Sequence, residues 1–303
     1  MKIIIIGSGP AGYTAAIYAT RFGLPTILIA GMQVGGQLTT THLIENFPGF
    51  PEPISGWDLT DKMRIQAEKF GCEIVYQTVT GVDFSDTNNK KVYLDNDTVL
   101  ESSVVIIATG ARAKYLGLES EQKYQGAGVS ACAVCDGMFY KNADVIVVGG
   151  GDSAVGEALY LSTICKKVYL AVRRDVLRAS EILVNRINNT PNIEILYKTN
   201  IKEIYGQGVV EGVEVETAGE VRKIALAGYF AAVGREPQID FLNNAVELDK
   251  NGYIKVFDNL TKTSVDGVFA CGDCADPVYR QAVVAAATGC KAAFDAKHYL
   301  ETK

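Results

Sequence analysis

Two glycine-rich turns, each set between an apolar strand and a predicted helix, indicate an α/β protein with two Rossmann-like domains of the three-layer ββα type. The first turn reads Gly7-Ser8-Gly9-Pro10-Ala11-Gly12, and the second reads Gly149-Gly150-Gly151-Asp152-Ser153-Ala154. Such a turn presents the N-terminus of a helix to a pyrophosphate. The 303 residues suffice for two domains of ordinary size. Strand patterns resume near the C-terminus, which predicts that the second domain is inserted into the first.

The composition is that of an ordinary globular chain, with 48% hydrophobic and 21% charged residues and a net charge of -6. It gives no reason to expect a nucleic acid or an anionic membrane as partner. No apolar run reaches the roughly 18–20 residues of a membrane helix. The run Ile3–Ile6 is too short for a signal peptide. We therefore expect a cytoplasmic protein, and seven cysteines, an odd number, argue against a secreted disulfide framework.

The first 30 residues predict a buried strand over 2–6, the glycine turn, a helix over 11–22 and a second strand over 26–30. The glycines of the turn allow tight bending, close approach of a phosphate and close helix packing. A Rossmann unit usually ends its second strand in an acid that binds a ribose. Ala30 and Gly31 stand there instead, so a ribose must be held by other groups.

A segment rich in glycine, threonine and amides covers residues 35–50. It is either a long surface loop or a loop that contacts a flavin ring, and we favour the second interpretation. The pattern then predicts a helix over 57–70 and strands over 73–84 and 91–107, with a hairpin turn at 95–97. Thr109 and Gly110 follow the last strand as a small-residue turn, where a ligand can approach the backbone.

A polar crossing segment over 112–130 marks the boundary between domains. We expect one domain to comprise 1–113 and 241–303, and the other 114–240. In the second domain, the strand over 167–172 ends in Arg173 and Arg174, with Arg178 close behind. An acid there would bind the 2′-hydroxyl of NAD, whereas arginines suit the 2′-phosphate of NADP; the alternative is a solvated charged loop.

The C-terminal portion reads as strands over 252–257 and 267–271 and a helix over 283–299. Gly272 and Asp273 follow the second of these strands. Asp273 suits a ribityl hydroxyl or a phosphate, and Gln281 and Ala282 would place a helix N-terminus close by.

The Cys132-Ala133-Val134-Cys135-Asp136 stretch lies between the two glycine turns. In a reducing compartment a Cys-x-x-Cys pair is usually catalytic or metal-binding. Cys271 and Cys274 have the same spacing, so a zinc site must be weighed. We predict no metal and favour a redox dithiol at Cys132 and Cys135. Cys271 and Cys274 are expected to be buried apolar residues, with a second redox pair as the alternative; the remaining cysteines, Cys72, Cys165 and Cys290, are expected in the core.

In this order, the motifs resemble those of the low-molecular-weight, bacterial-type thioredoxin reductases, within the flavin disulfide reductases. The resemblance covers nearly the whole chain and rests on the two turns, the dithiol, the arginines and the segments 35–38, 45–49, 108–110, 272–273 and 279–282. It implies FAD in the first domain, NADPH in the second, thioredoxin as partner and a homodimer. The residues it assigns to FAD are Gly7, Ser8, Gly9, Pro10, Ala11, Gly12, Ala30, Gly31, Gly36, Gln37, Leu38, Thr41, Asn46, Val79, Thr109, Gly110, Gly272, Asp273, Arg280, Gln281 and Ala282. Those it assigns to NADPH are Gly149, Gly151, Asp152, Ser153, Ala154, Arg173, Arg174 and Arg178.

The resemblance also implies a mechanism, in which electrons pass from NADPH to FAD, then to the disulfide and finally to thioredoxin. It makes Cys135 the sulfur nearer the flavin and Cys132 the one that attacks thioredoxin. Asp136 is the only nearby acid and the candidate acid–base, provided that partial burial raises its pKa. Because the dithiol belongs to the nucleotide domain, we expect that domain to rotate about residues near 112–116 and 236–240.

The sequence departs from the family pattern in the second domain. Val172 stands where a histidine is usual, and Gly156 stands where a glutamate is usual. The arginines are retained, so NADPH stays the expected nucleotide. The rival interpretations are a flavoprotein similar to ferredoxin–NADP reductases and a regulatory protein that only holds the cofactors.

Overall fold

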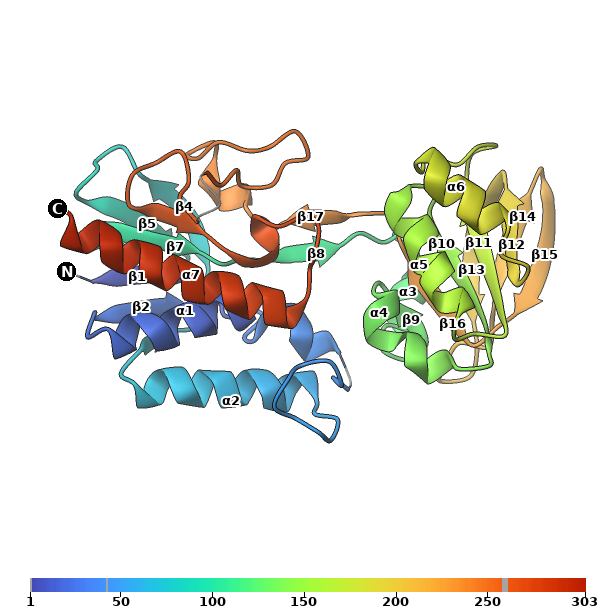
Figure 1. Ribbon diagram of the computed structural model, residues 1–303, viewed down its shortest axis with the longest axis horizontal. Coiled ribbons are helices and arrows are strands. Elements are labelled where there is room, and N and C mark those ends of the chain that lie inside the picture. The colour runs from blue at the N-terminus through green and yellow to red at the C-terminus, as the bar shows by residue number, and fades with distance from the viewer. Residues whose placement is uncertain (1, 42, 258–260) are drawn as a thin grey trace. The chain divides into compact units, whose positions relative to one another are not determined.

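The computed structural model describes residues 2–41, 43–257 and 261–303, so that one of the two histidines, His42, lies outside the described residues. The chain divides into two compact units, Met1–Arg112 with Glu236–Lys303, and Ala113–Arg235 (Figure 1). Strands β8 (Ala111–Ala113) and β17 (Arg235–Pro237) carry the chain across the two boundaries and pair with each other.

The second boundary falls five residues earlier than expected. Gln238 donates its backbone N–H to the carbonyl of Gly110 at 3.0 Å, and Ile239 packs against the apolar core of the first unit. Residues 236–240 therefore belong to the first unit.

The first unit is built on a parallel five-stranded sheet in the order β18-β7-β1-β2-β3. Four of these strands are buried along their whole length, which explains why all their residues except Thr26 are apolar. The edge strand β18 comes from the C-terminal portion and pairs with β7, so the unit is assembled from both ends of the chain. The strands are β1 (Ile3–Ile6), β2 (Thr26–Ile29), β3 (Glu73–Val75), β7 (Val104–Ile107) and β18 (Val268–Ala270).

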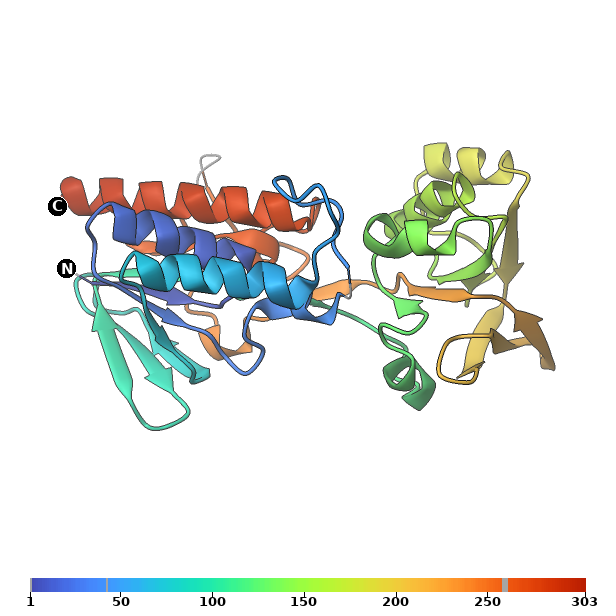
Figure 2. The same ribbon diagram turned by 90° about the horizontal axis from the view of Figure 1, so that it is seen from below.

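Two further layers cover this sheet, one on each face (Figure 2). Ile3 and Ile5 pack toward the helices, whereas Ile4 and Ile6 pack toward an antiparallel sheet, because successive side chains of a strand point to opposite faces. This confirms the three-layer ββα prediction for the first unit. The layers consist of α1 (Pro10–Arg21), α2 (Gly56–Lys69) and α7 (Ala282–Glu301), and of β4 (Val79–Asp83), β5 (Lys90–Leu94) and β6 (Val99–Ser102).

The second unit repeats the plan, with a parallel sheet in the order β12-β11-β10-β16-β9 and an antiparallel sheet β13-β14-β15. Its parallel strands are β9 (Val129–Ser130), β10 (Asp144–Val148), β11 (Lys167–Val172), β12 (Ile193–Tyr197) and β16 (Gly228–Ala231). Its antiparallel strands are β13 (Thr199–Tyr205), β14 (Gly212–Thr217) and β15 (Glu220–Ala225). Its helices are α3 (Glu119–Lys123), α4 (Ala133–Asp136), α5 (Asp152–Ser162) and α6 (Glu181–Asn188). The short strand β9 pairs with β16 and leads directly to the dithiol.

The expected boundary segment 112–130 crosses between the units at its start, and from Ala113 onward it is a folded part of the second unit. The buried Glu121 accepts backbone hydrogen bonds from Leu116, Gly117 and Leu118 there, and also the hydroxyl of Tyr229 at 2.6 Å. Residues 252–257 form no strand, because their N–H groups bond to scattered partners: Ile254 to Cys274 and Lys255 to Glu247.

Smaller differences between predicted and observed secondary structure concern the two long strands and one helix. The runs 73–84 and 91–107 are each broken into separate short strands. Part of the segment 35–50 forms a 3-10 helix, η1 (Gly36–Thr40), and α6 has no counterpart in the expectations. Within the described residues, no helix has the length and apolar character needed to cross a membrane.

Candidate redox site and nucleotide-binding turns

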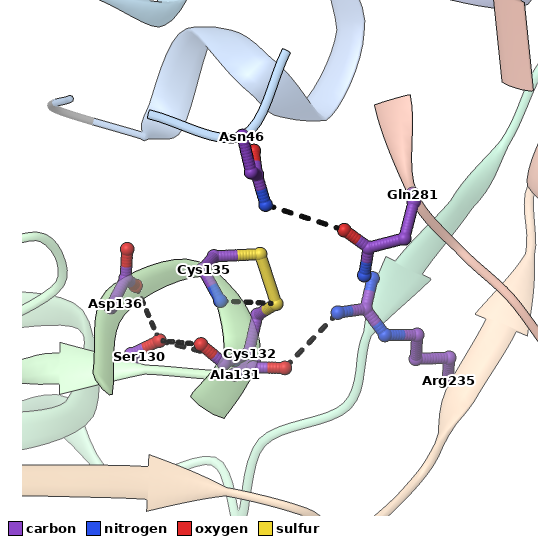
Figure 3. The surroundings of a disulfide bond; sticks show 8 residues. All are labelled: Asn46, Ser130, Ala131, Cys132, Cys135, Asp136, Arg235 and Gln281. Atoms are coloured by element: carbon purple, nitrogen blue, oxygen red, sulfur yellow. Dashed lines mark hydrogen bonds between the residues drawn. A yellow bond between two sulfur atoms is a disulfide. The ribbon is translucent and has the colours of Figure 1, made fainter. Parts of the chain in front are cut away.

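The cysteine pair sits on a single helical turn that begins where β9 ends. Cys132 is the N-cap of α4, and the N–H groups of Cys135 and Asp136 bond to its carbonyl at 3.2 and 3.1 Å. This turn brings the two Cα atoms to 5.3 Å, and the sulfurs form a disulfide (Figure 3). The Sγ of Cys132 also accepts the N–H of Cys135 at 3.3 Å. The sequence prediction of a disulfide-forming pair is confirmed.

Asp136 ends the same turn, and it is partly shielded from solvent. Burial raises the pKa of Asp136, while a hydrogen bond from Ser130 works in the opposite direction. The Oγ of Ser130 donates to Oδ2 of Asp136 at 2.5 Å (Figure 3). A raised pKa is the direction of shift that a proton donor near neutral pH requires.

Arg235 reaches the dithiol turn from the strand that follows β16. Its guanidinium donates from Nη2 to the carbonyl of Ala131 at 3.0 Å, next to Cys132 (Figure 3). Sequence reasoning assigned no role to Arg235 or to Ser130. Arg235 is about one hundred residues from the cysteines in sequence, and only the pairing of β9 with β16 brings the two together. Ser130 could have been noticed from its place two residues before Cys132.

Three apolar side chains on and after the turn are half exposed: Val134 (50%), Met138 (52%) and Phe139 (50%). Large apolar side chains that stay exposed beside a reactive group are typical of a surface that contacts another molecule.

The first glycine turn leaves an open position at the start of α1. Gly7 has a φ of +109°, and a Cβ on it would lie 2.4 Å from the carbonyl oxygen of Ala108. A Cβ on Gly9 would meet nothing within 4 Å, and no side chain caps the helix at this N-cap residue. Among the described residues no side chain caps the first N–H groups of α1, and this donor set fits a pyrophosphate.

Several other residues assigned to FAD lie at the same edge of the sheet. Gly7 and Ala30 directly follow the paired strands β1 and β2, whose ends lie in register with that of β7, and Thr109 and Gly272 lie two residues beyond β7 and β18, respectively. Gly36 also approaches this turn, because a Cβ on it would lie 3.2 Å from the Cα of Gly9. Ligands of parallel sheets bind at such carboxyl ends.

Several of these residues already make hydrogen bonds or packing contacts within the protein. The buried Ser8 donates its hydroxyl to the carbonyl of Ala30 and accepts the N–H of Gly35, so its hydroxyl hydrogen is already engaged within the protein. Val79 is buried in the core between the two sheets. Asn46 donates from Nδ2 to Oε1 of Gln281 at 3.5 Å, which brings the segment 35–50 to the N-cap of α7 (Figure 3).

The second glycine turn has the same geometry as the first. Gly149 has a φ of +148°, and a Cβ on it would lie 2.4 Å from the carbonyl oxygen of Ala232. Gly151 is the uncapped N-cap of α5, and a Cβ there would meet nothing within 4 Å. Asp152 accepts the N–H of Ser180 at 2.8 Å. The donor set of this turn also fits a dinucleotide pyrophosphate.

The three arginines of the second unit are exposed at the end of β11. The backbone N–H of Arg178 bonds to the carbonyl of Gly150 at 2.7 Å, which holds their loop against the glycine turn. No ion pair engages Arg173, Arg174 or Arg178 among the residues described. Their guanidinium groups are thus available to a phosphate beside the turn.

The remaining cysteines are reduced in this structure. Cys271 and Cys274 are fully buried, and they pack in the cores on opposite faces of the parallel sheet. Burial raises the pKa of Cys271, and it raises that of Cys274 to about 11. Cys72 and Cys165 are buried as expected, whereas Cys290 is only half-buried. The described residues contain no group of three acids, histidines or cysteines that could hold a metal.

The chain is similar to characterised proteins over nearly its whole length. Residues 1–289 match the family described as "Pyridine nucleotide-disulphide oxidoreductase". The thioredoxin reductase of Escherichia coli O157:H7 is 46% identical over 312 residues, which cover 99% of this chain and 96% of that protein. The thioredoxin reductase of Vibrio cholerae is 46% identical, with 100% and 97% covered. The solved thioredoxin reductase from Giardia duodenalis superimposes with a TM-score of 0.93 at 43% identity, covering 99% of this chain and 98% of that one.

Proposed function

The chain belongs to the thioredoxin reductases of the pyridine nucleotide-disulphide oxidoreductase family, and we propose that it carries electrons from NADPH through FAD and the Cys132–Cys135 pair to the disulfide of thioredoxin. The observation that carries this proposal is the disulfide on a single turn, next to a partly buried acid and in the same chain as two uncapped glycine turns. When bound, NADPH would supply a hydride, and FAD would pass its two electrons on to the Cys132–Cys135 disulfide.

The chemistry of the protein's own sulfurs is a pair of thiol–disulfide exchanges. Two electrons and two protons convert the Cys132–Cys135 disulfide to a dithiol. The thiolate of Cys132 attacks one sulfur of the thioredoxin disulfide, so that a mixed disulfide forms and one thioredoxin thiolate leaves. The thiolate of Cys135 then attacks the sulfur of Cys132, which restores the internal disulfide and releases the second thioredoxin thiolate.

Asp136 is the proposed source of the proton in the step that opens the internal disulfide. One of the two sulfurs leaves as a thiolate, and a carboxylic acid beside it can protonate it. The raised pKa of Asp136 supports this role, because the acid form then persists closer to neutral pH.

We assign FAD to the first unit and NADPH to the second. Support for FAD comes from the uncapped N-terminus of α1 and from the row of assigned residues at the carboxyl ends of β1, β2 and β7. Support for NADPH comes from the second glycine turn and from the exposed Arg173, Arg174 and Arg178, which suit a 2′-phosphate.

The nucleotide-binding turn and the dithiol both belong to the second unit. We therefore infer that this unit rotates, so that each can reach the flavin in turn. Strands β8 and β17 are the proposed pivot, and Arg112 and Glu236 form an ion pair there. A cytoplasmic homodimer is the proposed state of the protein.

One preparation tests the proposal. The purified protein is expected to have a yellow flavin spectrum and to reduce a chromogenic disulfide with NADPH only when thioredoxin is present. Cys132→Ser should retain the flavin and lose thioredoxin-dependent turnover. No thioredoxin-dependent turnover in the wild type, or full turnover in Cys132→Ser, would contradict the proposal; electron transfer to ferredoxin instead would favour the ferredoxin-linked alternative.

A further inference from the structure

The hydroxyl of Ser130 joins the carboxyl of Asp136 to the backbone of Cys132. Ser130 is the last residue of β9 and is buried. Its Oγ donates to Oδ2 of Asp136 at 2.5 Å and accepts the N–H of Cys132 at 3.1 Å. A single buried side chain thus contacts both the proposed proton donor and the residue that bears the proposed attacking sulfur.

The geometry allows this hydroxyl to stay bonded in both protonation states of Asp136. When Asp136 is ionised, Ser130 donates to the carboxylate. When Asp136 is protonated, its O–H can donate to the Oγ of Ser130, and the serine hydrogen can turn to the carbonyl of Cys132, which lies 3.5 Å away. The N–H of Cys132 is accepted in either case, because a hydroxyl oxygen has two lone pairs.

Ser130 is the direct hydrogen-bond partner of the Asp136 carboxyl. Within the described part of the chain, the only hydrogen bond to the side chain of Asp136 comes from Ser130. Tyr140 and Tyr115 face it from other segments at longer range; burial, with a smaller contribution from the charge of Asp136, raises the pKa of Tyr140 to about 12. Arg235 binds the carbonyl of Ala131 and not this carboxyl.

We propose that Ser130 is a positioning residue for the proton transfer, which holds the Asp136 carboxyl in one orientation relative to the turn that carries Cys132. This inference rests on the proposed function, because it deepens the role given there to Asp136. A general acid must be held in reach of the atom that it protonates, and a buried carboxyl without a fixed partner would rotate freely about its last side-chain bond.

The test compares three substitutions, Ser130→Ala, Ser130→Thr and Ser130→Val, with Ser162→Ala as a matched control. Threonine and valine have nearly the same volume, so comparing these two variants separates the effect of the hydroxyl group from the effect of packing. Ser162 is a half-buried serine of the same unit that donates to the carbonyl of Leu159 at 2.7 Å, away from the dithiol. The titration of Asp136 is followed by carbon NMR of the protein labelled at aspartate carboxyls, with the Asp136→Asn protein identifying the signal.

The alanine and valine variants are expected to titrate Asp136 at a higher pH than the wild type, because burial then acts without the opposing hydrogen bond. Their thioredoxin-dependent kcat should fall about tenfold, with the pH profile displaced in the same direction. Ser130→Thr and Ser162→Ala should keep the wild-type titration and profile.

An unchanged titration of Asp136 in folded Ser130→Val would overturn the inference, as would an equal loss of kcat in Ser130→Thr and Ser130→Val. The NMR titration needs no turnover. It therefore tests the Ser130–Asp136 contact even if the wild-type protein proves inactive toward thioredoxin, an outcome that refutes the proposed function alone.

Discussion

Replacing Asp136 by asparagine should make this protein more stable and much less active at the same time. The asparagine has the same shape, and its Oδ1 can accept the hydroxyl of Ser130 as the carboxyl does. The substitution therefore removes the titrating group and leaves the packing in place. Activity should fall by about 10² to 10⁴, the contribution of a positioned general acid.

The gain in stability follows from the sign of the pKa shift. Burial raises the pKa of Asp136 above its value in the unfolded chain, so the folded protein binds more protons in the window between the two values. Its free energy of unfolding must then fall as the pH rises through that window. At a pH above both values, each unit by which the folded-state pKa is raised lowers the free energy of unfolding by about 1.4 kcal/mol. Asparagine does not titrate, so it avoids this loss of stability. The free energy of unfolding of Asp136→Asn should therefore equal that of the wild type at low pH and exceed it most in alkaline solution.

The assay is denaturant unfolding of the oxidised wild-type and Asp136→Asn proteins over a series of pH values, with thioredoxin-dependent turnover measured on the same samples. Glu203→Gln is the control, because it also removes a carboxylate from the second unit but at an exposed position of β13. A difference in unfolding free energy between wild type and Asp136→Asn that stays constant from acid to alkaline pH would refute the reasoning about burial. Unchanged turnover would refute the role as acid.

Two further substitutions test the nucleotide site and the buried thiols. Replacing Arg173 and Arg174 together by glutamine should raise the KM for NADPH at least about tenfold and leave that for NADH nearly unchanged, since only NADPH carries the 2′-phosphate; equal effects on both nucleotides would argue for a merely solvated loop. Cys274→Val should keep turnover and lower the unfolding free energy by about 1–3 kcal/mol, because valine adds about one methyl group to a fully packed core. Strong loss of turnover in a stable Cys274→Val protein would instead indicate a second redox pair.

The fold was predictable where local sequence determines it. Strands β1, β2, β7 and β10 are short apolar runs that end in glycine or a small residue, and a strand buried on both faces needs such a run. The two glycine turns were predictable for a related reason, since Gly7 and Gly149 adopt backbone conformations that other residues rarely adopt. Residues 252–257 have a strand-like apolar sequence but form no strand, because the N–H groups of Ile254 and Lys255 bond to two different segments, at Cys274 and Glu247.

The surroundings of the dithiol were predictable only in part, because they depend on pairing between strands far apart in sequence. The Cys132–Cys135 disulfide is compatible with the spacing, since two intervening residues complete one helical turn, but Cys271 and Cys274 have the same spacing and are reduced. Arg235 reaches Ala131 only because β16 lies beside β9, and no local pattern encodes this pairing. The burial of Glu121 under Tyr229 is another long-range contact, and it explains why a polar segment proved to be folded.

The choice of residue at position 136 is itself an argument for proton transfer. Asparagine could accept the same hydrogen bond from Ser130, and it would avoid the loss of stability that a buried ionisable carboxyl brings above its unfolded pKa. What aspartate adds at this place, and asparagine cannot, is a proton that can be released. A partly buried acid with a raised pKa that directly follows a redox cysteine is therefore better explained by chemistry than by folding. The hydroxyl of Ser130 fits the same explanation, because it offsets part of the destabilisation while it keeps the carboxyl in one orientation.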